Sequence, residues 1–203
     1  LSNRKQCLYH LKELGYQIGA GFMVGAPGQT MENLAEDLVF LKKLNPHMAG
    51  IGPFIPHHDT KFAKEEPGSV ELTLFLLSVI RIMLPKVLLP ATTALGTLDP
   101  RGREKGFQAG AKAIIVCNPS NPCGKVFTRE ELTRIGELAV KYDGFVVTDE
   151  VYEHMVYAPN QHVCMASLPG MYEHTITCNS LSKTYSITGW RLGYLIGPEE
   201  VIE

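Results

Sequence analysis

The stretch FVVTDEVY, residues 145–152, decides the fold of the C-terminal half. Its β-branched apolar residues predict a short buried strand over 145–148, and polar residues follow that strand at once. Three other polar segments lie beside predicted strands: NPSNPCG (118–124) after a strand over 113–117, NSLSKT (179–184) after a strand over 174–178, and TGWRLGY (188–194), which runs into a last strand over 192–196. Open α/β sheets bind ligands at the carboxyl ends of their strands, so we expect these segments to line one cleft.

Helices and strands alternate along nearly the whole chain. Helical periodicity or capping residues predict helices over 3–14, 30–44, 70–84, 101–109 and 128–142, and further strands are expected over 17–24, 48–53 and 87–93. A loop rich in proline and charge covers 54–68, and Thr128 and Glu131 form a capping box at the start of the last helix. This alternation predicts an α/β chain with a mainly parallel sheet.

Bulk composition excludes several classes of protein. A formal net charge of −2 in 203 residues gives no electrostatic reason to bind nucleic acid or an anionic membrane. The longest apolar run, 72–84, is too short and too polar to span a bilayer. No secretory signal is visible in the N-terminal sequence, which predicts a cytoplasmic protein, and both ends look cut from a longer chain.

Cysteine and histidine spacing gives no metal site. The five cysteines lie far apart and none forms a CxxC pair, so we expect neither a disulfide framework nor a thiolate metal site. His57 and His58 are adjacent in the expected loop, and adjacent loop residues seldom converge on one ion, so we expect them to be solvated.

Together the four C-terminal segments resemble class I aminotransferases of the pyridoxal phosphate (PLP) fold type I, related to aspartate aminotransferase. The resemblance covers residues 112–203 and implies part of the sheet of that family's large domain. It implies amino-group transfer between an amino acid and a 2-oxo acid. Lys183 would form the Schiff base and move the Cα proton. Asp149 would face the pyridine nitrogen and keep it protonated.

The resemblance also implies the remaining contacts to PLP. Tyr152 and Asn121 would hydrogen-bond the phenolic oxygen, while Ser180 and Arg191, with help from Ser182, would hold the phosphate. Cys123 stands where the family usually has threonine. The family's ring-stacking aromatic and its substrate-carboxylate arginine have no match here, and the family completes its site in a homodimer. We therefore expect this chain alone to be incomplete for turnover.

The N-terminal half resembles a different family. The segments GAGFMVGAPGQT (19–30), GIGPFIPH (50–57) and PATTALGT (90–97) are similar to the biotin-synthase-like, radical SAM maturation proteins of FeFe-hydrogenase. This likeness implies the later βα units of that family's barrel, with residues 25–30 near the adenosyl ligand. Radical SAM chemistry needs a CxxxCxxC loop for its cluster, and the sequence has none, so no 4Fe–4S cluster is expected.

The two resemblances predict two domains, a barrel fragment over 1–111 and an aminotransferase large-domain fragment over 112–203. A strand of one family takes the place of a strand of the other at residues 110–112, which preserves the alternation. A misjoined gene fragment, a natural fusion and a deliberate chimera would each give this junction. Two other functions remain open beside transamination: a radical SAM maturation enzyme lacking its cluster loop, and a folded chimera without enzymatic activity.

Overall fold

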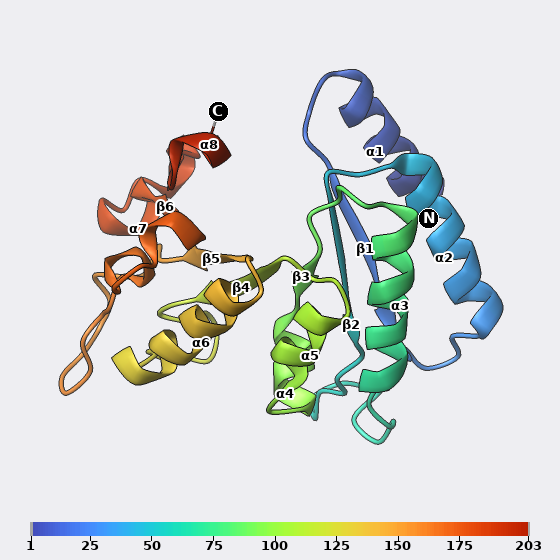
Figure 1. The fold of residues 1–203 in the computed structure, drawn as a ribbon, viewed down its shortest axis with the longest axis horizontal. Coiled ribbons are helices and arrows are strands. Elements are labelled where there is room, and N and C mark those ends of the chain that lie inside the picture. The colour runs from blue at the N-terminus through green and yellow to red at the C-terminus, as the bar shows by residue number, and fades with distance from the viewer. Residues whose placement is uncertain (1, 203) are drawn as a thin grey trace. The chain divides into compact units, whose positions relative to one another are not determined.

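The computed structural model describes residues 2–202 and divides into two compact units, residues 1–111 and 112–203 (Figure 1). Among the described residues no helix is both long and apolar enough to cross a membrane. Each unit has its own buried residues and its own parallel strand pairing.

Unit 1 is a parallel β/α arrangement. Its elements are α1 (Ser2–Glu13), β1 (Gly19–Val24), α2 (Met31–Leu44), β2 (Met48–Pro53), α3 (Val70–Met83), β3 (Pro90–Ala91), α4 (Thr93–Leu98) and α5 (Gly102–Gln108). Strands β1 and β2 pair in parallel, with Gly19 opposite Met48, and a parallel bridge joins Met48 to Leu88. Helices α2 and α3 lie beside these strands (Figure 1).

The core of unit 1 is built from one face of each of its longer helices and from its strands. Thr30 caps α2 through the amide of Asn33, and the helix ends at Asn45 in the left-handed backbone region. The helix then turns Leu34 and Leu41 toward a cluster of buried aliphatic residues, among them Val24, Ala49, Ile51, Leu77, Ile80 and Leu89. Burial of such side chains is the main stabilising term of a small domain.

Unit 2 contains a four-strand stretch of sheet. Its elements are β4 (Ala113–Cys117), α6 (Arg129–Lys141), β5 (Phe145–Asp149), the short 3₁₀ helices η1 (Met165–Ser167) and η2 (Tyr172–His174), β6 (Thr175–Ser180), α7 (Leu181–Thr184), η3 (Thr188–Trp190), β7 (Gly193–Ile196) and α8 (Glu199–Ile202). The strands lie in the order β4, β5, β6, β7; the first three are parallel, and β7 runs antiparallel to β6.

Helix α6 packs on the parallel strands because its N-terminus and its inner face are specified locally. The Glu131 amide donates to Thr128 Oγ1 at 3.2 Å, and the Thr128 amide donates to Glu131 Oε2 at 2.8 Å. Leu132 and Ala139 of its inner face are fully buried. Gly136 lets the chain at Met171 approach closely, since a β-carbon there would lie 2.6 Å from the Met171 sulfur.

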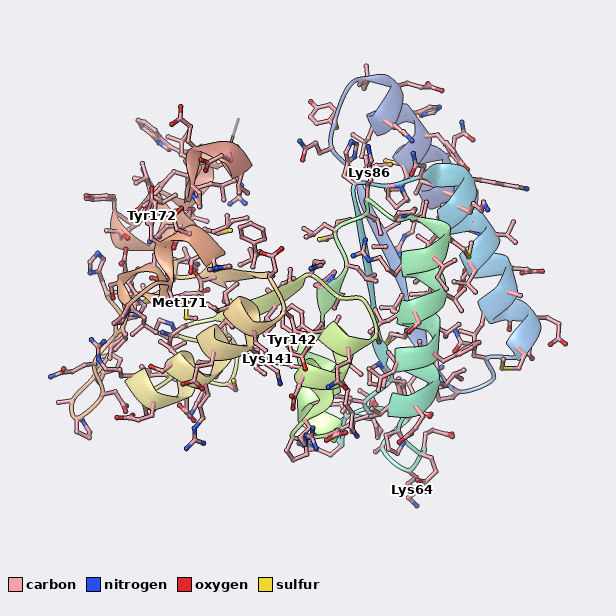
Figure 2. The ribbon with its side chains drawn as sticks, in the orientation of Figure 1. Lys64, Lys86, Lys141, Tyr142, Met171 and Tyr172 are labelled. Atoms are coloured by element: carbon pink, nitrogen blue, oxygen red, sulfur yellow. The ribbon has the colours of Figure 1, made fainter. Side chains whose placement is uncertain are left out.

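Two consecutive residues, Met171 just before η2 and Tyr172 at its start, connect the loops of unit 2 to its strands. Met171 is buried, while the hydroxyl of neighbouring Tyr172 donates to the carbonyl of Gly197 at 3.2 Å (Figure 2). The second contact fixes the chain just beyond β7, whose own residues are all exposed.

The expected α/β class with a mainly parallel sheet is confirmed, and so is the capping box at Thr128. The strand expected over 87–93 is wrong in extent. Only Pro90–Ala91 is strand, and Thr93–Leu98 forms helix α4. The reason is tertiary packing: Leu95 is fully buried, and Gly102 of α5 approaches its carbonyl so closely that a β-carbon would overlap it.

Candidate functional site

The carboxyl ends of β4, β5 and β6 lie at one edge of the sheet. Cys117 is the register partner of Asp149, and Asp149 is the partner of Cys178. The ladder continues one step further, because the Asn118 amide donates to the Asp149 carbonyl at 2.9 Å and the Glu150 amide donates to the Cys178 carbonyl at 3.0 Å. The three polar segments that follow these strands therefore begin side by side.

Three of the expected site residues meet where those segments leave the sheet. Asn121 Nδ2 donates to the Tyr152 hydroxyl at 3.0 Å. The Lys183 amine lies 5.7 Å from the centroid of the Tyr152 ring, within reach of a cation–π contact. Asn121 and Tyr152 lie in the segments after β4 and β5, and Lys183 lies in α7 after β6, so their proximity depends on the parallel pairing of the strands and not on local sequence.

Asp149 is the last residue of β5, and its side chain is exposed. Its carboxylate makes a local contact, because the Val151 amide donates to Oδ1 at 3.3 Å. Burial raises the pKa of the Cys117 and Cys178 thiols, and the negative charge of Asp149 raises the pKa of both further. The carboxylate therefore retains acceptor capacity for a cationic or N–H group at the sheet edge.

Ser180 and Ser182 form a pair of hydroxyls at the start of α7. Their oxygens lie 2.6 Å apart, the Ser182 amide donates to Ser180 Oγ at 3.1 Å, and Ser180 Oγ is also 2.9 Å from the Leu192 carbonyl. That last contact exists because β7 returns antiparallel, which places Gly193 opposite Ser180.

The same reversal brings Arg191 back toward this edge. Arg191 has a left-handed backbone (φ 54°) and its Nη1 donates to the Thr188 carbonyl at 3.1 Å. The side chain is otherwise exposed, so most of the five guanidinium N–H donors remain available to a ligand.

A cavity of about 330 Å³ opens beside the Asn121–Tyr152 hydrogen bond. Pro119, Val126, Met155 and Tyr157 are among its lining residues, together with Asn121 and Tyr152 themselves. Asp149, Ser180, Lys183 and Arg191 do not line it. The structure thus joins Asn121, Tyr152 and Lys183 by contact, and Ser180 to Ser182, without placing all seven expected residues around this cavity.

The chemistry of this donor set fits PLP. A free carboxylate at Asp149 suits a protonated pyridine nitrogen, and the amide and phenol of Asn121 and Tyr152 suit a phenolic oxygen. Two adjacent hydroxyls and an exposed guanidinium suit a phosphate dianion. The amine at Lys183 supplies the nucleophile that an aldehyde requires.

Sequence reasoning assigned no role to three polar residues near the site. Asn118 and Glu150 are each 1% exposed, and His162 is mostly buried and contacts Glu150. The alternation of side chains along β5 could have shown that Glu150, like Thr148, points inward when Asp149 points outward. His162 lies in an irregular loop, where no periodic signal exists.

The loop histidines of unit 1 are exposed, as expected. His57 and His58 stack on each other, and His58 Nε2 lies 3.2 Å from an Asp59 carboxylate oxygen, with every side chain of the group exposed to solvent. Within residues 2–202, which include every cysteine, all five thiols are free.

Several known proteins are similar to parts of this chain. Human kynurenine–oxoglutarate transaminase 3 is 51% identical over 107 residues, which is 53% of this chain and 24% of that protein. The [FeFe] hydrogenase maturase subunit HydE of Thermotoga maritima is 54% identical over 113 residues, 56% of this chain and 32% of that protein. The chain therefore spans only about a quarter to a third of the length of these relatives.

Among solved structures, N-succinyldiaminopimelate aminotransferase of Mycobacterium tuberculosis is similar to 49% of this chain and 27% of its own, with 40% sequence identity and a TM-score of 0.46. The family described as aminotransferase class I and II matches residues 97–203, which is more than half of the chain. By that match, the chain belongs to the aminotransferase class I and II family.

Proposed function

We propose that unit 2 binds PLP and serves amino-group transfer between an amino acid and a 2-oxo acid. One observation carries the proposal: Asn121, Tyr152 and Lys183 leave three different strand ends and meet at a hydrogen bond of 3.0 Å and a ring contact of 5.7 Å. Membership of the family and similarity to a kynurenine–oxoglutarate transaminase support it.

Each residue then has one task in holding the cofactor. Lys183 would hold PLP covalently through Nζ, and Asp149 would accept the hydrogen bond of the cofactor's ring nitrogen. Tyr152 and Asn121 would hold its phenolic oxygen. The phosphate would be held by Ser180, Ser182 and Arg191. When bound, PLP supplies an electron sink for an amino acid that loses its Cα proton.

Lys183 also acts as the base in this proposal. Its free amine would accept the proton from the substrate Cα and would later return a proton. The Tyr152 ring lies beneath that amine and limits its positions. The negative charge of Asp149 would favour protonation of the cofactor's ring nitrogen.

We infer that the chain alone turns over poorly. Rapid proton transfer requires the substrate carboxylate to be clamped so that its Cα–H bond is aligned, and such positioning can be worth roughly 7–11 kcal/mol of barrier. Unit 2 carries Arg191 for the phosphate, but none of the matched segments supplies a second arginine for the carboxylate or an aromatic to stack on the ring. A homodimer or further chain would have to provide them.

The test is a PLP titration of the purified chain followed by borohydride reduction and peptide mass spectrometry. We expect one PLP per chain, fixed to Lys183, and no binding of this kind in Lys183→Ala. Lys125→Ala is the matched control, because Lys125 lies in the same unit and its half-exposed amine contacts Glu131 and the Phe127 ring, neither of which is an expected site residue. Labelling of other lysines instead of Lys183 would refute the proposal.

We propose a second, separate assignment for unit 1, a fragment of a radical SAM-like barrel. Its parallel β1–β2 pair, the parallel bridge to Leu88 and the similarity of the chain to HydE support this reading. It adds no catalytic group to unit 2. Anaerobic reconstitution with iron and sulfide, described below, tests whether it holds a cluster.

A further inference from the structure

Two buried polar residues stand one position beyond the ends of β4 and β5, and the proposed function uses neither. Asn118 follows β4 and Glu150 follows β5, and both are 1% exposed. A buried carboxylate is costly unless hydrogen bonds replace its water shell. Glu150 must therefore be held by specific partners, and those partners show what the pair does.

Both side chains bind the same segment, residues 162–165, through two backbone groups and the His162 side chain. Glu150 Oε1 accepts from the Met165 amide at 3.1 Å, and its Oε2 lies 3.0 Å from His162 Nε2. Asn118 Nδ2 donates to the Val163 carbonyl at 3.2 Å. The 162–165 segment is thus fixed at three residues, 162, 163 and 165, by side chains that follow two neighbouring strands.

Asn118 at the same time closes the loop that carries Asn121. The backbone N–H of Asn118 donates to the Asp149 carbonyl at 2.9 Å, where the loop begins. The side-chain Oδ1 of Asn118 accepts from the Phe127 backbone N–H at 3.0 Å, where the loop ends. Asn121 therefore sits in a loop whose two ends are both held by Asn118, one through its backbone N–H and the other through its side-chain Oδ1. Glu150 lies between Asp149 and Tyr152 and anchors that turn in the same way.

Glu150, Glu153 and His162 form a cluster of two carboxylates and one imidazole, and hydrogen bonds explain how Glu150 is buried there. Burial alone would raise the pKa of Glu150, but hydrogen bonds from His162 and the Met165 amide outweigh it and lower that pKa. Glu153 Oε1 accepts from Asn179 Nδ2 at 2.7 Å. Both oxygens of Glu150 and one oxygen of Glu153 thus contact protein groups, so hydrogen bonds within the protein account for the position of the Glu150 carboxylate.

We propose that Asn118 and Glu150 are positioning residues which, through the 162–165 segment, hold Asn121 and Tyr152 at hydrogen-bonding distance. The meaning of that contact for catalysis rests on the proposed function, whereas the contact itself does not. The expected consequence is that loss of either buried side chain separates Asn121 from Tyr152 although neither of them is changed.

The first test uses hydrogen–deuterium exchange on the cofactor-free chain. Glu150→Ala leaves the Met165 amide and His162 without a partner, so exchange of residues 162–165 should accelerate about tenfold or more. Glu150→Gln keeps the shape and the acceptor for the Met165 amide, and should restore slow exchange. Glu173→Ala, a change at an exposed glutamate of the same unit, should have no effect.

The second test reads the Asn121–Tyr152 contact directly, as the ¹⁵N NMR signal of the Asn121 side-chain amide, assigned with Asn121→Asp. Tyr152→Phe gives the position of the signal when the bond is absent. Glu150→Ala and the shape-matched Asn118→Asp should move the signal to that position, and Glu150→Gln should return it. A destabilised but correctly positioned site would leave the signal in place.

An unmoved Asn121 signal in Glu150→Ala and Asn118→Asp, or unchanged exchange of the 162–165 segment, would overturn the inference. Neither measurement needs cofactor. If the PLP titration fails while both measurements succeed, the proposed function is wrong and the positioning network stands. If the titration succeeds and the Asn121 signal does not move, the positioning role of Asn118 and Glu150 is wrong and the proposed function stands.

Discussion

Burial raises the pKa of Cys178, and the carboxylate of Asp149, its register partner on β5, raises that pKa further. Asp149→Asn should therefore lower the pKa of Cys178 toward the ordinary value of 9.0, while burial keeps it above that value. Alkylation of Cys178 at pH 8 should become faster, by up to about tenfold for each pKa unit removed. The measurement is the iodoacetamide rate at Cys178 as a function of pH, followed by mass spectrometry.

Cys123 provides the internal control for that experiment. It is exposed, and its hydrogen bond with Ser120 lowers its pKa, so it should be alkylated fastest in both proteins. An identical pH midpoint for Cys178 in wild type and Asp149→Asn would show that the two groups do not interact.

The capping box of α6 should contribute measurable stability to unit 2. Thr128→Ala removes the acceptor of the Glu131 amide and should cost about 1 kcal/mol. Exchange of the α6 amides should then be about fivefold faster. Thr133→Ala is the matched control, because Thr133 lies on the exposed face of the same helix and its hydroxyl only donates back to the Arg129 carbonyl. Equal effects of the two changes would contradict the prediction.

Unit 2 should lose stability in acid partly through Glu150. Its folded pKa is lowered from 4.5, so below that pH the unfolded chain binds the proton more readily than the folded one. The stabilisation is present above about pH 4.5 and disappears as the pH falls through the lower folded pKa. The free energy of unfolding of wild type minus that of Glu150→Gln should therefore shrink from pH 6 to pH 3. A difference that stays constant with pH would contradict the assignment.

Iron reconstitution should give no stable 4Fe–4S cluster. A radical SAM cluster needs three cysteine thiolates that converge on it. Unit 1 contains only one cysteine, Cys7, and the other four cysteines belong to unit 2. We expect well under one iron per chain after desalting and no charge-transfer absorption. Close to four irons per chain, lost on changing the cysteines, would reverse the conclusion.

The sequence correctly predicted elements that have a capping residue at their start or a compact run of apolar residues. The helix from Thr128 has a capping box, and the strand over 113–117 is a compact apolar run, and both appear where the sequence indicates them. Helix α4 has no such mark: Thr92 makes no side-chain cap, and threonine and glycine are poor helix formers, so only the burial of Leu95 explains it.

The geometry of the candidate site depends on pairings that a sequence pattern does not encode. An apolar strand looks the same whether it runs parallel or antiparallel, so the reversal at β7 that brings Arg191 toward Ser180 was not predictable from residues 192–196. The contact from Asn118 to Val163 spans 45 residues and ends on a backbone carbonyl, which carries no residue-specific signal.

At position 191 the left-handed backbone favours glycine, whereas the proposed phosphate contact requires arginine. L-residues other than glycine pay roughly 1–2 kcal/mol for that conformation, whereas glycine adopts it freely. Under the proposed role, however, only arginine supplies the guanidinium for the phosphate. A laboratory selection for thermostability alone should therefore accumulate glycine at this position and lose cofactor affinity, while a selection that also demands the cofactor should keep the arginine and accept the less stable chain.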